Sequence, residues 1–269
     1  MTESAAAGKR QSGFAKHPDY RVDFVPSPKR VRVFLGGEAI ADSTGAMLMR
    51  ETGHVPVYYF PRDDVRLDLA SATDNETFCP FKGEASYWTL AVGGKRAENA
   101  VWSYQDPFPE AGHIKDYLAF YWDRVDAWFE EDEEIFVHAR DPYVRIDVLT
   151  SARPVEVVLG GETVARSLRA MFVFETGMPT RYYLPADDVR MDLLVPSDKR
   201  TSCPYKGTAA YWSARLGGET FEDVVWSYPD PLAEVAGIKG LICFFNERVD
   251  AITVDGSEVP KVRTKWSEG

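Results

Sequence analysis

The sequence predicts a mainly β protein made of two tandem homologous domains of short antiparallel strands with short helices. The first observation is an internal repeat: after a shift of 124 residues, residues 31–126 align with residues 155–250 without a gap, and 47 of the 96 positions are identical. The second is the number of short segments in which apolar and polar residues alternate, as in strands. The third is a glycine pair in each copy, which suits a tight hairpin turn. These features favour a sandwich or barrel-like architecture.

The expected elements follow in order along the first copy. Residues 31–35 and 38–41 form two strands that turn at the glycine pair, and the second copy repeats this turn at residues 160–161. Aromatic and β-branched residues predict further strands at 47–51, 57–60, 86–92, 100–104 and 118–129. Helices are expected only as short pieces at residues 64–70 and 109–115, where acidic residues or proline precede apolar positions.

The repeat and the local composition predict the domain boundaries. Residues 1–16 are small, polar and glycine-bearing, as in a disordered tail. We place the first repeat domain at residues 17–139 and the second at residues 140–269. The junction near Arg140 follows the acidic run at residues 130–134, whose like charges favour solvent.

Composition disfavours several classes of function. The chain carries 31 basic and 42 acidic side chains, and its net charge of −11 would repel nucleic acid and anionic membranes. It has no apolar run long enough to cross a bilayer, and residues 1–13 lack the apolar core of a secretion signal, so we expect a cytoplasmic protein. The three cysteines and four histidines have no metal-ligand spacing, so we predict no metal and no cofactor.

The most distinctive repeated string carries a lysine. Residues 79–83 are Cys-Pro-Phe-Lys-Gly, and residues 203–207 are Cys-Pro-Tyr-Lys-Gly. A partly desolvated lysine in this loop would be available as a nucleophile or as an acid–base group. It equally suits binding of a carboxylate or phosphate, or a structural ion pair. The cysteine three residues earlier has no repeated histidine beside it as a base, so we interpret it as a packed thiol.

Carboxylates in two other repeated strings are the expected partners of this lysine. Glu51 ends an apolar strand, and an inward-pointing glutamate there would need Lys82 or Arg66 as a partner. Glu110 follows the repeated Trp-Ser-Tyr string and acts either as a general base or by favouring the start of a helix. The candidate catalytic residues are Lys82, Glu51 and Glu110, with Lys206, Glu175 and Glu234 in the second copy.

Three repeated strings resemble the family called domain of unknown function 427. They are Tyr-Tyr-x-Pro-x-Asp-Asp-Val-Arg, Cys-Pro-[Phe/Tyr]-Lys-Gly-x-Ala-x-Tyr-Trp and Trp-Ser-Tyr-x-Asp-Pro, each present twice within residues 20–250. The resemblance implies β-tent or Mss4-like domains, here without the zinc-binding cysteine pairs of several relatives. It implies little about activity. The family's nucleotidyltransferase-like label gains no support here, because the chain has no glycine-rich phosphate loop and no Asp-x-Asp pair on a strand.

Two functional hypotheses follow. In the first, each domain is a small-molecule enzyme or ligand-binding module whose aromatic pocket holds a lysine and a carboxylate. Its predicted ligand-binding residues are Tyr59, Tyr87, Trp102, Tyr104, Arg66 and Cys79, and in the second copy Tyr183, Tyr211, Trp226, Tyr228, Arg190 and Cys203. In the alternative, the chain is a non-catalytic protein–protein interaction module whose aromatics are core and whose acidic surface meets a basic partner.

The expected partner is an unknown small molecule, rather than nucleic acid or a membrane. The second copy replaces several polar residues of the first with apolar or small ones; for example, Arg50 aligns with Phe174 and His54 with Met178. A more apolar second copy would favour docking of the two repeats as an intramolecular pseudo-dimer.

Overall fold

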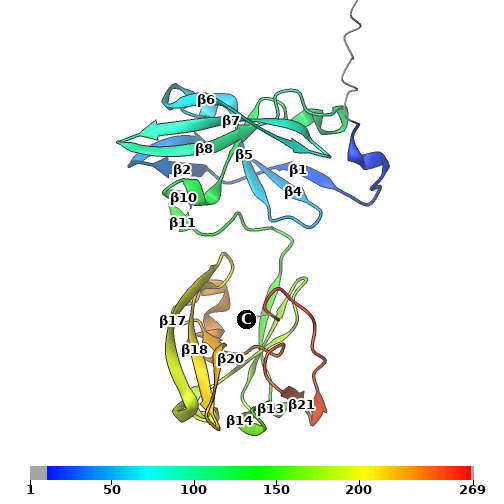
Figure 1. Cartoon of the computed structure of the whole chain (residues 1–269), viewed down its shortest axis with the longest axis vertical. Coiled ribbons are helices and arrows are strands. Elements are labelled where there is room, and N and C mark those ends of the chain that lie inside the picture. The colour runs from blue at the N-terminus through cyan, green and yellow to red at the C-terminus, as the bar shows by residue number, and fades with distance from the viewer. Residues whose placement is uncertain (1–10, 268–269) are drawn as a thin grey trace, which may run out of the picture. The chain divides into compact units, whose positions relative to one another are not determined.

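The computed structural model describes residues 11–267, and the chain divides into two compact units, Met1–Asp141 and Pro142–Gly269 (Figure 1). The expected disordered tail falls in part outside the described residues. Residues 11–16 are described and differ from that expectation, because Gly13–Ala15 form the short 3-10 helix η1. The Gly13 N–H donates a 2.8 Å hydrogen bond to the Pro80 carbonyl, which ties this segment to the lysine loop.

The first domain contains a seven-stranded antiparallel sheet, in the order β1-β4-β5-β9-β8-β7-β6, and a four-stranded sheet, in the order β11-β10-β2-β3. The strands are β1 Val22–Pro26, β2 Val31–Leu35, β3 Glu38–Ser43, β4 Met47–Glu51, β5 Val57–Pro61, β6 Ala70–Cys79, β7 Gly83–Val92, β8 Lys95–Ser103, β9 Tyr117–Phe120, β10 Ala127–Glu130 and β11 Glu133–Ile135. Short 3-10 turns connect them: η2 Arg62–Asp64, η3 Leu67–Leu69, η4 Pro109–Ile114 and η5 Trp122–Arg124.

The second domain repeats this plan, with sheet orders β12-β15-β16-β20-β19-β18-β17 and β14-β13-β21-β22. Its strands are β12 Ile146–Thr150, β13 Val155–Leu159, β14 Glu162–Ser167, β15 Met171–Glu175, β16 Arg181–Leu184, β17 Leu194–Cys203, β18 Gly207–Leu216, β19 Glu219–Ser227, β20 Ile242–Phe244, β21 Ala251–Val254 and β22 Ser257–Glu258. Its turns are η6 Ala186–Asp188, η7 Met191–Leu193 and η8 Ala233–Ile238.

The prediction of two mainly β tandem domains with short helices is confirmed, and the differences lie in single elements. The helix expected at residues 64–70 is two 3-10 turns separated by extended backbone at Val65. The strand expected at 118–129 is two strands, β9 and β10, with η5 between them. Strand β6 was not predicted because most of its residues are exposed at the sheet edge, so it lacks an apolar alternation.

The seven-stranded sheet of the first domain carries apolar side chains on both faces. Side chains alternate along β5: Tyr58 and Phe60 join the main core with residues of the four-stranded sheet, whereas Tyr59 joins a second cluster. The second cluster, which we call the aromatic face, contains buried Met49, Tyr59, Ala85, Tyr87, Tyr104, Ala111, Ile114 and Ala119. Its counterpart in the second domain is built around Tyr183, Tyr211, Trp226 and Tyr228. The candidate site lies at this face.

Candidate functional site

A buried ion pair lies beside the aromatic face in each domain. The Lys82 ammonium contacts a Glu51 carboxylate oxygen, and Lys206 Nζ lies 2.5 Å from Glu175 Oε2. Only 6% of Lys82 and 9% of Lys206 is exposed, so both lysines lie away from solvent. Of the two partners expected for Glu51, the structure selects the lysine. The carboxylate compensates the charge of each buried lysine.

The glycine that follows each lysine allows the backbone turn that positions the lysine. Glu51 is the last residue of β4, and Lys82 immediately precedes β7 in the turn that joins β6 to β7. Gly83 has φ +104° and Gly207 has φ +95°, a backbone region that disfavours residues with a Cβ. The Lys82 carbonyl then accepts a 3.1 Å hydrogen bond from the N–H of Phe108, just before η4. The repeat of Lys-Gly in both copies is therefore explained by the backbone conformation of the glycine as well as by the chemistry of the lysine.

Tyr104 lies beside the pair, and other residues of the aromatic face are held by hydrogen bonds. Lys82 Nζ lies 5.5 Å from the Tyr104 ring centroid, a cation–π distance. Trp102 Nε1 donates to Tyr59 Oη at 3.3 Å, and Tyr87 Oη shares a 2.7 Å hydrogen bond with Thr77. Burial raises the pKa of both Tyr59 and Tyr104, so these phenols stay protonated at neutral pH.

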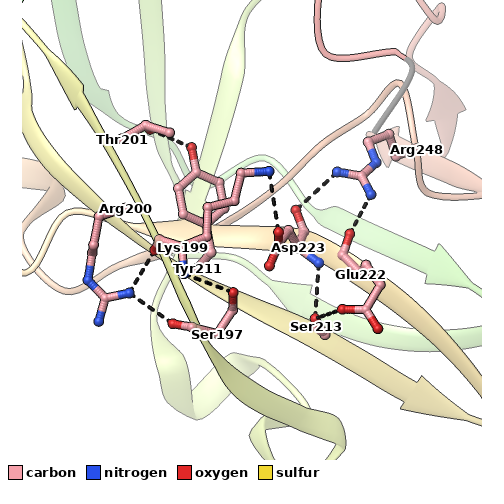
Figure 2. Close-up of polar contacts among 9 residues, drawn as sticks. All are labelled: Ser197, Lys199, Arg200, Thr201, Tyr211, Ser213, Glu222, Asp223 and Arg248. Atoms are coloured by element: carbon pink, nitrogen blue, oxygen red, sulfur yellow. Dashed lines mark hydrogen bonds and ion pairs between the residues drawn. The ribbon is translucent and has the colours of Figure 1, made fainter.

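The second domain repeats the two hydrogen bonds. Trp226 Nε1 donates to Tyr183 Oη at 3.1 Å, and Tyr211 Oη shares a 2.7 Å hydrogen bond with Thr201, which Figure 2 shows. Burial raises the pKa of Tyr183 and of Tyr228. Seven of the predicted aromatic residues are buried, and the eighth, Trp102, is half-buried against the same face.

Tyr20, which the repeat did not indicate, contacts the ion pair of the first domain. Tyr20 Oη donates a 2.9 Å hydrogen bond to Glu51 Oε2, and its ring stacks on Phe81 with centroids 3.5 Å apart. Burial, followed by the hydrogen bond to Glu51, raises the pKa of Tyr20. Val144 is its counterpart in the second copy, so a comparison of the two copies had no signal for Tyr20. A pocket of about 220 Å³ lies on the same loop, between Pro80, Phe81 and residues 11–17.

The other predicted site residues lie elsewhere or at the margin. Glu110 and Glu234 are exposed in the first turns of η4 and η8. The exposed Arg66 and Arg190 pair with Asp68 and Asp192, each at 2.7 Å. Cys79 and Cys203 are half-buried and pack against the two aromatic clusters, as expected for small thiols.

The second domain has an additional buried ion pair beside its aromatic cluster. Arg181 donates to both carboxylate oxygens of Glu247, at 2.7 and 2.6 Å. Burial is the largest influence and opposes the charge of Arg181, but hydrogen bonding to Glu247 together with the charges of neighbouring groups gives a net rise of the arginine pKa. Burial likewise opposes the charge of Glu247, yet the hydrogen bonds that it accepts lower its pKa. Both groups are therefore charged at neutral pH.

A polar network beside the β18–β19 pairing of the second domain is structural. Ser213 Oγ accepts the Asp223 N–H at 3.1 Å and donates to Glu222 at 2.8 Å, while Arg248 donates to the carbonyls of Glu222 and Asp223 (Figure 2). Asp223 has φ +49° where the β18–β19 register shifts. In the first domain Asn99, also at φ +49°, occupies the same position, and Arg124 donates to the carbonyls of residues 98 and 99. The network thus stabilises a repeated bulge.

The fold and the site define a class: a tandem-duplicated β protein in which each domain buries a Lys–Glu pair beside an aromatic sheet face. The model of the family described as Domain of unknown function (DUF427) matches residues 23–131 and again residues 147–255. The chain belongs to this family and contains two tandem copies of its domain. A search of curated proteins found no match.

Two further observations concern residues 11–267, the part of the chain that the structure describes. None of its helices is long and apolar enough to span a bilayer. Among the same residues, no group of three His, Cys, Asp or Glu side chains is placed to hold a metal ion.

Proposed function

We propose that each domain binds a small organic molecule at its aromatic face, with the buried Lys–Glu pair as the polar group of the site. The observation that carries this proposal is the presence of the pair in both copies. Apolar residues of similar volume often stabilise a fold as well as a buried ion pair does, so stability alone is a weak reason to keep it. Titratable groups beside a mainly aromatic surface are typical of ligand sites.

The pair also provides acid–base chemistry. In the first domain, Tyr20, Glu51 and Lys82 form a chain of hydrogen bonds in which the phenol and the ammonium donate to one carboxylate. A bound carbonyl or carboxylate group would take over the lysine as its hydrogen-bond donor and leave Glu51 available as a base. The second domain has Lys206 and Glu175 but Val144 in place of the tyrosine, so we assign the fuller acid–base function to the first domain.

The test is native mass spectrometry of the purified full chain, with the pair replaced by neutral groups in both domains. The variant carries Lys82→Met with Glu51→Gln and Lys206→Met with Glu175→Gln, so that it leaves no single charge buried. We expect the wild type to retain a small molecule and this variant to lose it. The control is Arg66→Met with Arg190→Met, because these arginines pair with aspartates at the surface. A molecule retained equally by the folded pair variant would contradict the proposal.

One observation favours the alternative of a protein–protein interaction module. The second domain exposes 54% of Leu149 on β12 and 42% of Phe174 on β15, two strands that pair with each other. Exposed apolar side chains on adjacent strands suit contact with a protein. Capture of one stoichiometric partner that is lost on Phe174→Arg, the residue type at the aligned position 50, would support this function, provided that the purified protein retains no small molecule.

A further inference from the structure

The second domain shows which chemical group fits against its aromatic cluster. Arg181, from β16, places its guanidinium carbon 5.5 Å from the Trp226 ring, 5.8 Å from the Phe245 ring and 5.7 Å from the Trp266 ring. Only 6% of Trp226 and of Phe245 is exposed. The aromatic rings and the Glu247 carboxylate together form a site that suits a guanidinium. In this domain the chain's own Arg181 occupies that site.

The first domain has counterparts of two of these three rings and lacks the arginine. Trp102 and Tyr121 align with Trp226 and Phe245, and their ring centroids lie 4.6 Å apart, against 4.2 Å in the second domain. Asp123 aligns with Glu247, and Val57 takes the place of Arg181. Trp266 lies beyond the second repeat, and the residue that aligns with it is Pro142, in the other unit. Accordingly, Trp102 and Tyr121 are half-buried where their counterparts are buried.

A neighbouring arginine does not take the place of Arg181. The Arg124 guanidinium lies 4.1 Å from the Tyr121 ring centroid and donates to the carbonyls of residues 98 and 99. Its counterpart Arg248 makes the same two bonds and lies 5.7 Å from Phe245 while Arg181 is also present. The second domain therefore holds both guanidinium groups at one ring. By the repeat, the position in the first domain that corresponds to the Arg181 guanidinium lies near Arg124.

We propose that the first domain binds the guanidinium group of a small organic cation beside Trp102 and Tyr121, with Asp123 as its counter-ion, and that Arg181 fills the equivalent site of the second domain. The inference rests on the proposed function, since it names the ligand class of the first aromatic face. The guanidinium lies along the rings and directs two N–H groups toward the carboxylate, as Arg181 does with Glu247. A primary ammonium of equal charge matches this planar arrangement less well.

The test uses agmatine as a probe of the full chain, with indole N–H signals read by NMR. The Trp102 signal, identified by its loss in Trp102→Phe, is expected to shift with millimolar agmatine, while the Trp226 signal stays in place. 1,5-Diaminopentane, which has the same charge of +2 as agmatine but carries a primary ammonium in place of the guanidinium, is expected to bind about tenfold more weakly. An unshifted Trp102 signal, or equal binding of 1,5-diaminopentane, would overturn the guanidinium assignment.

Variants that exchange residues between the two copies make the test reciprocal. Val57→Arg with Asp123→Glu builds the second-domain ion pair into the first domain and is expected to abolish the Trp102 response. Arg181→Val with Glu247→Asp and Trp266→Ala opens the second site and is expected to add a response at Trp226. A persisting Trp102 response, or a folded triple variant with no response at Trp226, would contradict the proposal. Ligand retention that depends on the Lys–Glu pair, together with a silent Trp102, would reject this inference and leave the proposed function standing.

Discussion

At the scale of single residues, the Lys82–Glu51 pair shows how two charges become dependent on each other. The lysine side chain is 8% exposed and the glutamate side chain 10%, so neither is hydrated enough to remain charged alone without a large penalty. The sequence indicated both residues because both copies repeat them, and it offered Lys82 as one of two partners for Glu51. It did not indicate Tyr20, whose hydrogen bond to Glu51 exists only in the first domain.

This dependence predicts unequal effects of single and double substitutions. Lys82→Met and Glu51→Gln should each lower the free energy of unfolding of the first domain by about 3–5 kcal/mol, because each leaves one charge buried without its partner. The double variant should lie within about 2 kcal/mol of the wild type, because no charge is left unpaired. Urea unfolding followed through first-domain NMR signals measures all three. The surface control Arg66→Met should change the value by less than about 1 kcal/mol. Single variants no worse than this control would show that the pair is effectively solvated.

At the scale of secondary structure elements, strands were predictable from sequence where buried and exposed side chains alternate. They were not predictable where a strand is held only by hydrogen bonding to its neighbour. Tyr58, Tyr59 and Phe60 form a continuous apolar run on β5, and the structure uses both faces of it. Strand β6 is held by its pairing with β7, which no side-chain pattern within β6 reports. The glycine pairs were informative because the β2–β3 hairpin needs positive φ at both positions, +59° and +83°.

The same hairpin predicts a difference between the two domains. Gly36 has φ +59°, and an added Cβ would lie 2.4 Å from the Val92 carbonyl oxygen. Its counterpart Gly160 has φ +58°, but the nearest atom to its Cβ is 3.5 Å away, on the Phe221 ring. Gly160→Ala should therefore cost about 1–2 kcal/mol of unfolding free energy from backbone strain alone. Gly36→Ala should cost at least about 3 kcal/mol, since backbone must also move. Equal losses in urea unfolding would mean that the first hairpin relaxes without penalty.

At the scale of the whole molecule, duplication made the fold predictable and the difference between the two sites hard to predict. The two aligned copies identified the domains, the lysine loop and most of the aromatic face. They also suggested that the second copy is the more apolar one, whereas at its aromatic cluster the structure shows a gained ion pair, Arg181 with Glu247. Val57 in the first copy aligns with Arg181 in the second. The role of Arg181 could not be predicted from this difference, because Trp266, which lies near its guanidinium, is outside the repeat.

The division of the core predicts that each domain folds by itself. Among residues 11–267, two buried clusters consist of residues up to 141 and two of residues from 142 onward. A fragment of residues 1–141 and one of residues 142–269 are each of ordinary domain size. Both should unfold cooperatively and give dispersed NMR spectra.

A shorter fragment tests the same reasoning within the second domain. A fragment that ends at residue 258 keeps all its strands but lacks Thr264, which donates to Glu247 at 2.8 Å, and Trp266, which packs near Arg181. It should unfold at lower urea concentration than residues 142–269, by about 1–3 kcal/mol in unfolding free energy, because Glu247 loses a buried hydrogen bond and Phe245 loses an aromatic neighbour. Equal stability would place the segment outside the second core. A disordered spectrum for residues 1–141 would instead show that the first core is incomplete without the second unit.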